Sequence, residues 1–120
     1  MTRAFQMIAA AAMTAAILAS PALAHSVLER SDPAADATVP APERLELTFS
    51  ETIGLRFSTL SLTDPDGAEI ETDGPELSDD GHSLILPLSQ PLTAGDYQVR
   101  WGVLSQDGHK VDGEYGFTVE

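Results

Sequence analysis

The segment that decides the fold is Asp96-Tyr-Gln-Val-Arg-Trp-Gly-Val103. Large apolar side chains occupy every second position in it, and Gln98 and Arg100 alternate with them. A period of two is typical of a β-strand that buries one face. The segment therefore predicts a strand whose inward side chains are Tyr97, Val99, Trp101 and Val103.

The same alternation recurs along the chain. It predicts strands over 44–50, 57–63, 83–88 and 115–119, and weaker ones over 26–30 and 68–71. Turn sequences rich in Gly, Pro and Asp separate them at 64–67, 72–75, 79–81 and 93–95, and 32–42 is expected to be a loop. About seven short strands with frequent turns predict an all-β sandwich of one domain.

The N-terminal segment has the pattern of a secretory signal peptide. Arg3 precedes an uncharged, alanine-rich run over 5–18, and Ala22-Leu23-Ala24 has the small residues of a cleavage site. The alternative, an uncleaved anchor helix, needs about 20 apolar residues, and this run is shorter. We therefore expect residues 1–24 to be a signal peptide, with an exported mature domain over 25–120 and no stable membrane insertion after cleavage.

The expected mature domain is strongly acidic and contains no sulfur. Arg3 is one of the six basic residues, so five remain against all 19 acidic residues, a formal charge of −14. Nucleic acid requires clustered basic residues, so it is not expected as a partner. The chain has no cysteine, and its methionines are Met1, Met7 and Met13. Thiolate and thioether ligands are thereby excluded after residue 13.

Cleavage after Ala24 would give His25 both a free α-amine and an imidazole. The amine nitrogen and ring Nδ1 of one residue can close a chelate ring on a metal ion. Nitrogen ligands of this kind suit Cu(II), which heads the affinity order of the divalent ions. A cut at any other residue would remove this chelate.

Further oxygen and nitrogen donors lie in Asp107-Gly108-His109. In an extended segment residues two apart face the same side, so Asp107 and His109 could meet at one ion. Gly108 would allow close approach of backbone or ligand. Glu51 is a candidate for a further oxygen ligand or for a partner that orients a ligating histidine. Taken alone, each of these residues is also compatible with an ordinary solvated loop.

His82 follows Asp80-Gly81 and so mimics the later tripeptide. Turn chemistry accounts for its neighbours, and we interpret His82 as an exposed turn residue. Ser105 lies near His109, but no Ser–His–acid catalytic set is recognisable.

The chain resembles the CopC/PcoC family of periplasmic copper-resistance proteins. The resemblance rests on His25 after the signal, and on four further segments that span most of the mature chain. These are Ser31-Asp32-Pro33-Ala34, Leu47-Thr48-Phe49-Ser50-Glu51, Pro91-Leu-Thr-Ala-Gly-Asp-Tyr97 and Val99-Arg100-Trp101 running through Ser105-Gln-Asp-Gly-His109 to Gly113 and Phe117.

That resemblance implies a small Greek-key sandwich, immunoglobulin-like or cupredoxin-like. It also implies one Cu(II) held by His25, Asp107 and His109, with Glu51 nearby, and a CopD-type inner-membrane partner. The better-known members carry a methionine-rich Cu(I) loop. The corresponding stretch here, 63–83, has acidic residues and glycines instead. A thioether Cu(I) site is therefore not expected.

Three functions remain open from the sequence. The first is a monomeric, non-enzymatic copper carrier or buffer in copper homeostasis or resistance. The second is a small copper-brace enzyme similar to lytic polysaccharide monooxygenases, although 96 residues with few aromatic side chains offer little surface for sugars. The third is a metal-free, immunoglobulin-like interaction module.

Overall fold

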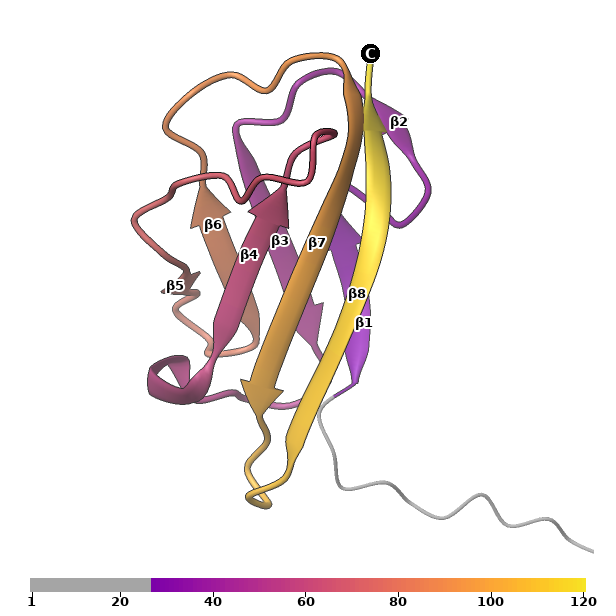
Figure 1. Ribbon diagram of the computed structural model, residues 1–120. Helices are drawn as coiled ribbons and strands as arrows, with labels where there is room; N and C mark the ends of the chain where they lie inside the picture. Colours follow the sequence, from indigo (N-terminus) through magenta and orange to yellow (C-terminus); the bar gives the residue numbers. More distant parts are fainter. Residues whose placement is uncertain (1–26) are drawn as a thin grey trace, which may run out of the picture.

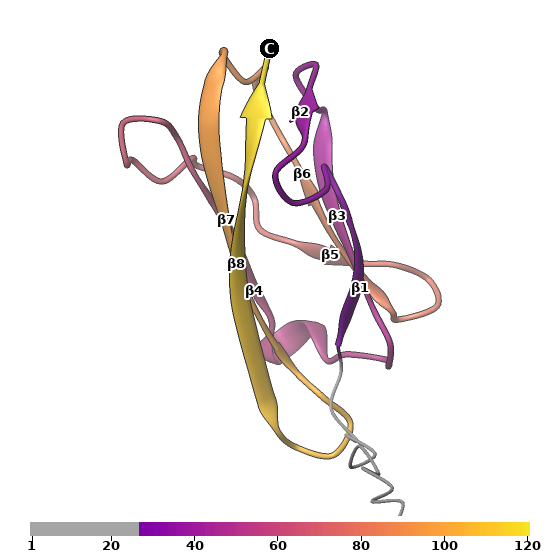
Figure 2. The same cartoon turned by 90° about the vertical axis from the view of Figure 1, so that its right-hand side faces the viewer.

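The computed structural model describes residues 27–120, which form two four-stranded sheets (Figures 1 and 2). The first sheet has the order β1 (Leu28–Asp32), β3 (Arg44–Phe49), β6 (Ser83–Pro87), β5 (Glu76–Leu77). The second has the order β2 (Thr38–Val39), β8 (Lys110–Val119), β7 (Gly95–Leu104), β4 (Thr59–Thr63). A short 3-10 helix, η1 (Leu55–Phe57), precedes β4. The expected all-β sandwich is confirmed.

The connections place two hairpins at the same end of the sandwich. β5 pairs with β6 and β7 pairs with β8, each antiparallel, while the other connections cross between the sheets in the Greek-key manner. The β7–β8 hairpin forms the lower end of the molecule in Figure 1, where β1 and β6 also begin. Residues of the two hairpin loops can therefore approach the start of β1.

The core lies between the two sheets and consists of the inward positions of their strands. Leu45, Leu47 and Phe49 of β3 are buried, as are the alternating residues of β7. The rings of Phe49 and Trp101 pack in a T-shaped arrangement at a centroid distance of 5.2 Å, and Tyr97 stacks on Phe117 at 5.6 Å. The alternation that predicted these strands therefore reflects burial of one face.

Four local expectations were wrong. The segment 57–63 forms a strand only from Thr59, because η1 occupies its start. The segment 68–71 forms an isolated bridge, Thr63 to Glu69, and no strand. β8 begins at Lys110, five residues earlier than expected. The expected loop 32–42 contains β2, which pairs with β8 in parallel.

Candidate functional site

The β7–β8 loop is a tight hairpin turn built from Ser105 to His109. The amide of Gly108 donates to the carbonyl of Ser105 at 3.0 Å, and the amide of Ser105 donates to the carbonyl of His109 at 2.9 Å. Gly108 has φ +85, in the left-handed region that glycine adopts without steric cost. A three-residue loop that ends in a left-handed glycine is a common hairpin connection.

This turn brings the side chains of Asp107 and His109 together. His109 Nδ1 lies 3.0 Å from Asp107 Oδ2, and the His109 amide donates to Asp107 Oδ1 at 3.1 Å. The expected meeting of these two residues is found, but the chain is a turn here and not an extended segment. Gly108 contributes the left-handed backbone conformation of this turn. The His109 side chain is 65% exposed and that of Asp107 25%.

Ser105 determines how Asp107 is held. Its hydroxyl donates to Asp107 Oδ1 in a short hydrogen bond and lies 3.1 Å from the His109 carbonyl oxygen. The Ser105 hydroxyl is the main cause that lowers the pKa of Asp107 below its usual range, with the amide and ring of His109 acting in the same direction. Asp107 is therefore a carboxylate across the physiological pH range. The sequence argument considered Ser105 only as a nucleophile and missed this role.

The loop between β5 and β6 repeats the same construction. Ser78-Asp79-Asp80-Gly81-His82 matches the β7–β8 loop in four of five residue types. Ser78 Oγ donates to Asp80 Oδ1 at 2.6 Å, the His82 amide donates to the same oxygen at 3.0 Å, and Gly81 has φ +75. Both loops share the sequence pattern Ser-x-Asp-Gly-His, which therefore indicates a turn in which the serine and the histidine amide hold the aspartate.

The two loops differ in the direction of the histidine ring. His82 Nδ1 lies 3.2 Å from the carbonyl oxygen of Phe49, and the residue is half-buried. The interpretation of His82 as an exposed turn residue is therefore wrong about its exposure, although it does lie in a turn. Its Nδ1 is occupied by the backbone, whereas that of His109 faces a carboxylate.

The segment after β3 joins three neighbouring parts of this end of the sandwich. The Val27 amide donates to Ser50 Oγ at 2.9 Å, and the Ser50 amide donates to the Val27 carbonyl at 2.9 Å. Thr52 Oγ1 accepts a short hydrogen bond from the Gln106 side chain. The Ile53 amide donates to the Gly81 carbonyl at 3.0 Å. Residues 50–53 thus contact the start of the described chain and both hairpin loops.

The structure brings together part of the predicted metal site. Asp107 and His109 are in contact, and Glu51 is half-buried between Ser50 and Thr52. His25, the fourth predicted residue, lies outside the described residues. Within residues 27–120 no group of three or more His, Cys, Asp or Glu side chains is arranged to hold a metal ion. No helix in that range is long and apolar enough to cross a bilayer.

Comparison with known proteins places the chain in a family. The CopC domain model matches residues 28–120. The Escherichia coli protein called Copper resistance protein C is 36% identical over 110 residues, covering 86% of this chain and 87% of that protein.

Solved structures give the same result for the fold. The crystal structure of CopC from Methylosinus trichosporium OB3b matches with a TM-score of 0.73 and 35% identity, over 80% of this chain and 94% of that chain. PcoC from Escherichia coli, described as a methionine-rich copper resistance protein, matches with a TM-score of 0.72 and 35% identity, over 80% and 99%.

Proposed function

The chain belongs to the CopC family, and from that membership we propose that it is an exported copper(II) carrier or buffer. The proposed ligands are the α-amine and imidazole of His25 together with Asp107 and His109. Cleavage after Ala24 frees the amine, and the mature domain, residues 25–120, acts in the periplasm as a monomer. One Cu(II) is bound per mature chain.

The observation that carries this proposal is the separation of His109 Nδ1 and Asp107 Oδ2, which is 3.0 Å. Nitrogen and oxygen ligands bind first-row divalent ions at roughly 2 Å, so two ligands at a right angle lie about 2.8 Å apart. The two side chains therefore already have the spacing of neighbouring ligands on a tetragonal ion. The hydrogen bonds of the hairpin turn hold them there without the metal.

The position of Val27 supports the participation of His25. The backbone amide and carbonyl of Val27 both form hydrogen bonds with Ser50. This contact lies at the end of the sandwich where the β7–β8 loop also lies. Two residues of chain span at most about 7 Å, and we therefore propose that His25 ligates the ion close to this anchor. Glu51 follows Ser50 directly, and we propose that it ligates the ion or orients the His25 ring.

The donor chemistry supports Cu(II) over Cu(I). The set contains three nitrogens and one or two oxygens, and no sulfur occurs after Met13. Soft Cu(I) prefers thioether and thiolate ligands, which this domain lacks. We propose storage or transfer of the ion, without catalysis, and a CopD-type inner-membrane protein as the recipient.

The ligand set is tested by comparing the two similar loops in the exported, N-terminally sequenced protein. His109→Ala should weaken copper(II) binding by at least 100-fold in a competition titration, since a ligand is lost. His82→Ala is the matched control and should leave affinity within about twofold, because His82 Nδ1 faces a backbone carbonyl. Equal losses in both variants, or an N-terminus other than His25, would refute the proposed site.

The α-amine can be tested separately through pH. Copper displaces its proton, whose reference pKa is about 7.7–8.0, so affinity should fall as pH drops below 8. Asp107 adds no pH dependence in this range because its pKa is held below the usual aspartate value. N-terminal acetylation should weaken binding strongly and remove the amine's part of the pH dependence.

A further inference from the structure

The proposed copper ligands belong to both sheets. Asp107 and His109 lie in the hairpin loop of the second sheet, whereas Glu51 follows β3 of the first sheet. Val27, which precedes β1, is bonded to the same segment after β3. The distance between the two groups of ligands therefore depends on how the hairpin loop is held against the first sheet.

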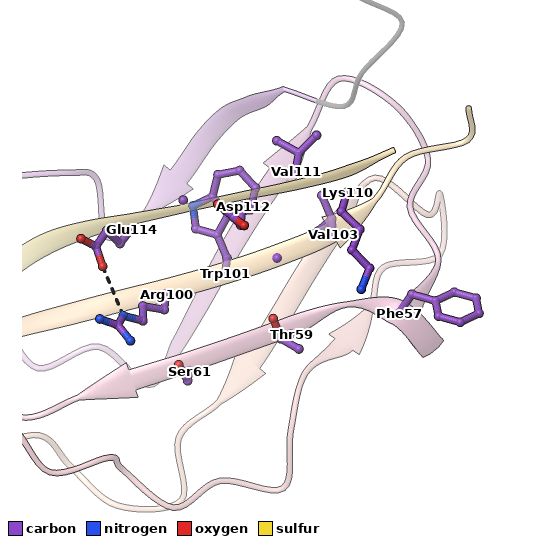
Figure 3. Close-up of a pocket in the computed structure, with 12 residues that line it drawn as sticks. Phe57, Thr59, Ser61, Arg100, Trp101, Val103, Lys110, Val111, Asp112 and Glu114 are labelled. Carbon is purple, nitrogen blue, oxygen red and sulfur yellow. Dashed lines mark hydrogen bonds and ion pairs between the residues drawn. The ribbon is translucent and has the colours of Figure 1, made fainter. Parts of the chain in front are cut away.

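The β7–β8 hairpin extends beyond β4, its neighbour in the sheet. The last pair between β4 and β7 is Thr59 with Gly102, whereas β7 and β8 remain paired as far as Leu104 and Lys110. The outer face at this point is open, with a hollow of about 670 Å³ lined in part by Thr59 and Gly102 (Figure 3). A two-stranded ribbon is only marginally stable by itself, so the loop at its tip needs a further contact to occupy one position.

Gln106 supplies such a contact. Its side-chain amide donates a hydrogen bond to Thr52 Oγ1, and Figure 2 shows the loop turned toward the sheet that contains β1 and β3. The hydrogen bonds of the Ser105 hydroxyl and the Gly108 amide, in contrast, begin and end within the loop. Those bonds shape the loop, and the bond from Gln106 fixes the loop relative to the first sheet.

Thr52 is itself held in place. The next residue, Ile53, is buried, and its amide donates to the Gly81 carbonyl at 3.0 Å. The methyl group of Thr52 packs beside Gly81, where a Cβ would lie 3.5 Å from it. Because the same segment is bonded to Val27, the hydrogen bond to Thr52 attaches the hairpin loop to the part of the first sheet that also holds the start of β1.

We propose that Gln106 is a positioning residue of the copper site, which keeps Asp107 and His109 at a fixed distance from the ligands of the first sheet. Gln106 and Thr52 would act without touching the ion. Ligands that are held in place before the ion arrives lose less conformational freedom on binding, and this raises affinity. The inference rests on the proposed function for its meaning, but the hydrogen bond and its effect on the loop need no metal.

The metal-free protein tests the effect on the loop. Thr52→Val removes the acceptor at nearly the same side-chain volume, while Thr52→Ser keeps the hydroxyl. We expect NMR order parameters of the amides 105–109 to be about 0.85 in the unaltered protein and in Thr52→Ser, and below about 0.6 in Thr52→Val and Gln106→Ala. Equal order parameters in all four proteins would overturn the proposal, whatever their copper affinity.

Copper(II), titrated in competition with a chelator, then tests the effect on the site. Gln106→Ala and Thr52→Val should each weaken binding by about tenfold, the usual cost of losing a group that orients metal ligands. The double variant should lie within about twofold of either single variant, because both remove the same hydrogen bond. Thr52→Ser should retain affinity within about twofold of the unaltered protein. Additive losses, or an equal loss in Thr52→Ser, would overturn the proposal.

Gln98→Ala is the matched control, because it removes the same kind of side chain from β7 at the level of Gly116, away from the loop. It should change copper affinity by less than about twofold. The EPR lines of bound Cu(II) should broaden in Gln106→Ala and Thr52→Val, since a looser loop lets the ligands adopt several arrangements, and should stay sharp in Gln98→Ala.

Two further outcomes would count against the proposal in different ways. A lowered affinity with unchanged EPR lines would show that the hydrogen bond only stabilises the fold. Failure of the unaltered protein to bind copper(II) would refute the proposed function and with it this role, and it would be seen before any variant is compared. The melting temperature and amide spectrum of each metal-free variant verify that it folds.

Discussion

Individual side chains distinguish the loop that carries the proposed copper ligands from its similar neighbour. Asp80 and Asp107 are held in the same way by a serine hydroxyl and a histidine amide, and both have lowered pKa values for that reason. Only His109 turns its Nδ1 toward the carboxylate; His82 Nδ1 lies by the Phe49 carbonyl. The loop sequence thus positions the aspartate, and the surrounding strands determine the direction of the histidine ring.

Ser105→Ala should weaken copper(II) binding by roughly tenfold, because groups that hydrogen-bond to metal ligands and orient them contribute on that scale. The variant loses the bond that fixes Asp107 and should also lower the free energy of unfolding by about 1 kcal/mol. Competition titration and urea unfolding measure the two effects.

Ser78→Ala is the matched control for this prediction. It removes the equivalent bond to Asp80, so it should lower stability similarly and leave copper affinity unchanged. If Ser105→Ala retained full affinity, Asp107 would not need the hydroxyl to be positioned.

Sequence reasoning at this scale found Asp107 and His109 but not the reason that they meet. The period of two suggested a common face, whereas the contact comes from the turn that Ser105 and Gly108 build. Exposure of His82 could not be predicted, because it depends on the distant Phe49 carbonyl. The placement of His25 and its chelate stays a prediction.

At the scale of elements, β8 shows how packing can hide a strand in the sequence. Its inward positions include Val111 and Gly113, and the glycine interrupts the apolar alternation. A Cβ at Gly113 would lie 2.6 Å from the Trp101 ring, so the indole occupies the space of that side chain. The first half of the strand, residues 110–114, was missed from the sequence because its core residue at this position comes from β7.

Gly113→Ala should therefore destabilise the domain by about 1–3 kcal/mol, the usual cost of overpacking a core. Urea unfolding followed by the fluorescence of Trp101, the single tryptophan, measures it. Gly54→Ala is the control, since its Cβ would meet Phe57 only at 3.8 Å, and it should be nearly neutral. A loss below 0.5 kcal/mol for Gly113→Ala would show that the indole moves freely.

The attachment of β1 gives another test at this scale. Ser50→Ala removes the acceptor of the Val27 amide and should cost about 1 kcal/mol of stability. It should also weaken copper binding severalfold although Ser50 is not a proposed ligand, because the Val27 anchor next to the proposed ligand His25 is loosened. Thr48→Ala, which removes the Thr48–Ser83 hydroxyl contact at 2.8 Å on the same strand, is the control and should affect stability only.

For the whole molecule, charge is the dominant feature that folding has to accommodate. Eight acidic residues and no basic ones lie between residues 64 and 80. Self-repulsion of a net charge this far from zero destabilises the compact state and is screened by salt.

The melting temperature at neutral pH should accordingly rise with sodium chloride. A screening gain of about 1 kcal/mol would raise it by roughly 4–8 °C for a domain of this size. The triple variant Glu69→Gln, Glu71→Gln, Asp73→Asn should have a higher melting temperature than the unaltered domain at low salt. Its melting temperature should also rise less when salt is added. Calorimetry over a series of salt concentrations measures these melting temperatures. A melting temperature that does not change with salt would mean that the repulsion is negligible.

The edges of both sheets have a consequence for the protein at high concentration. β2 and β5 are only two residues long, the register of β1 shifts between Leu28 and Arg30, and the Ile70 amide already donates to the Leu62 carbonyl of β4. Short, bent or covered edges offer little backbone on which a strand from a neighbouring molecule could add. We expect a crowded solution of this domain to resist fibril growth without needing disulfide bonds for protection.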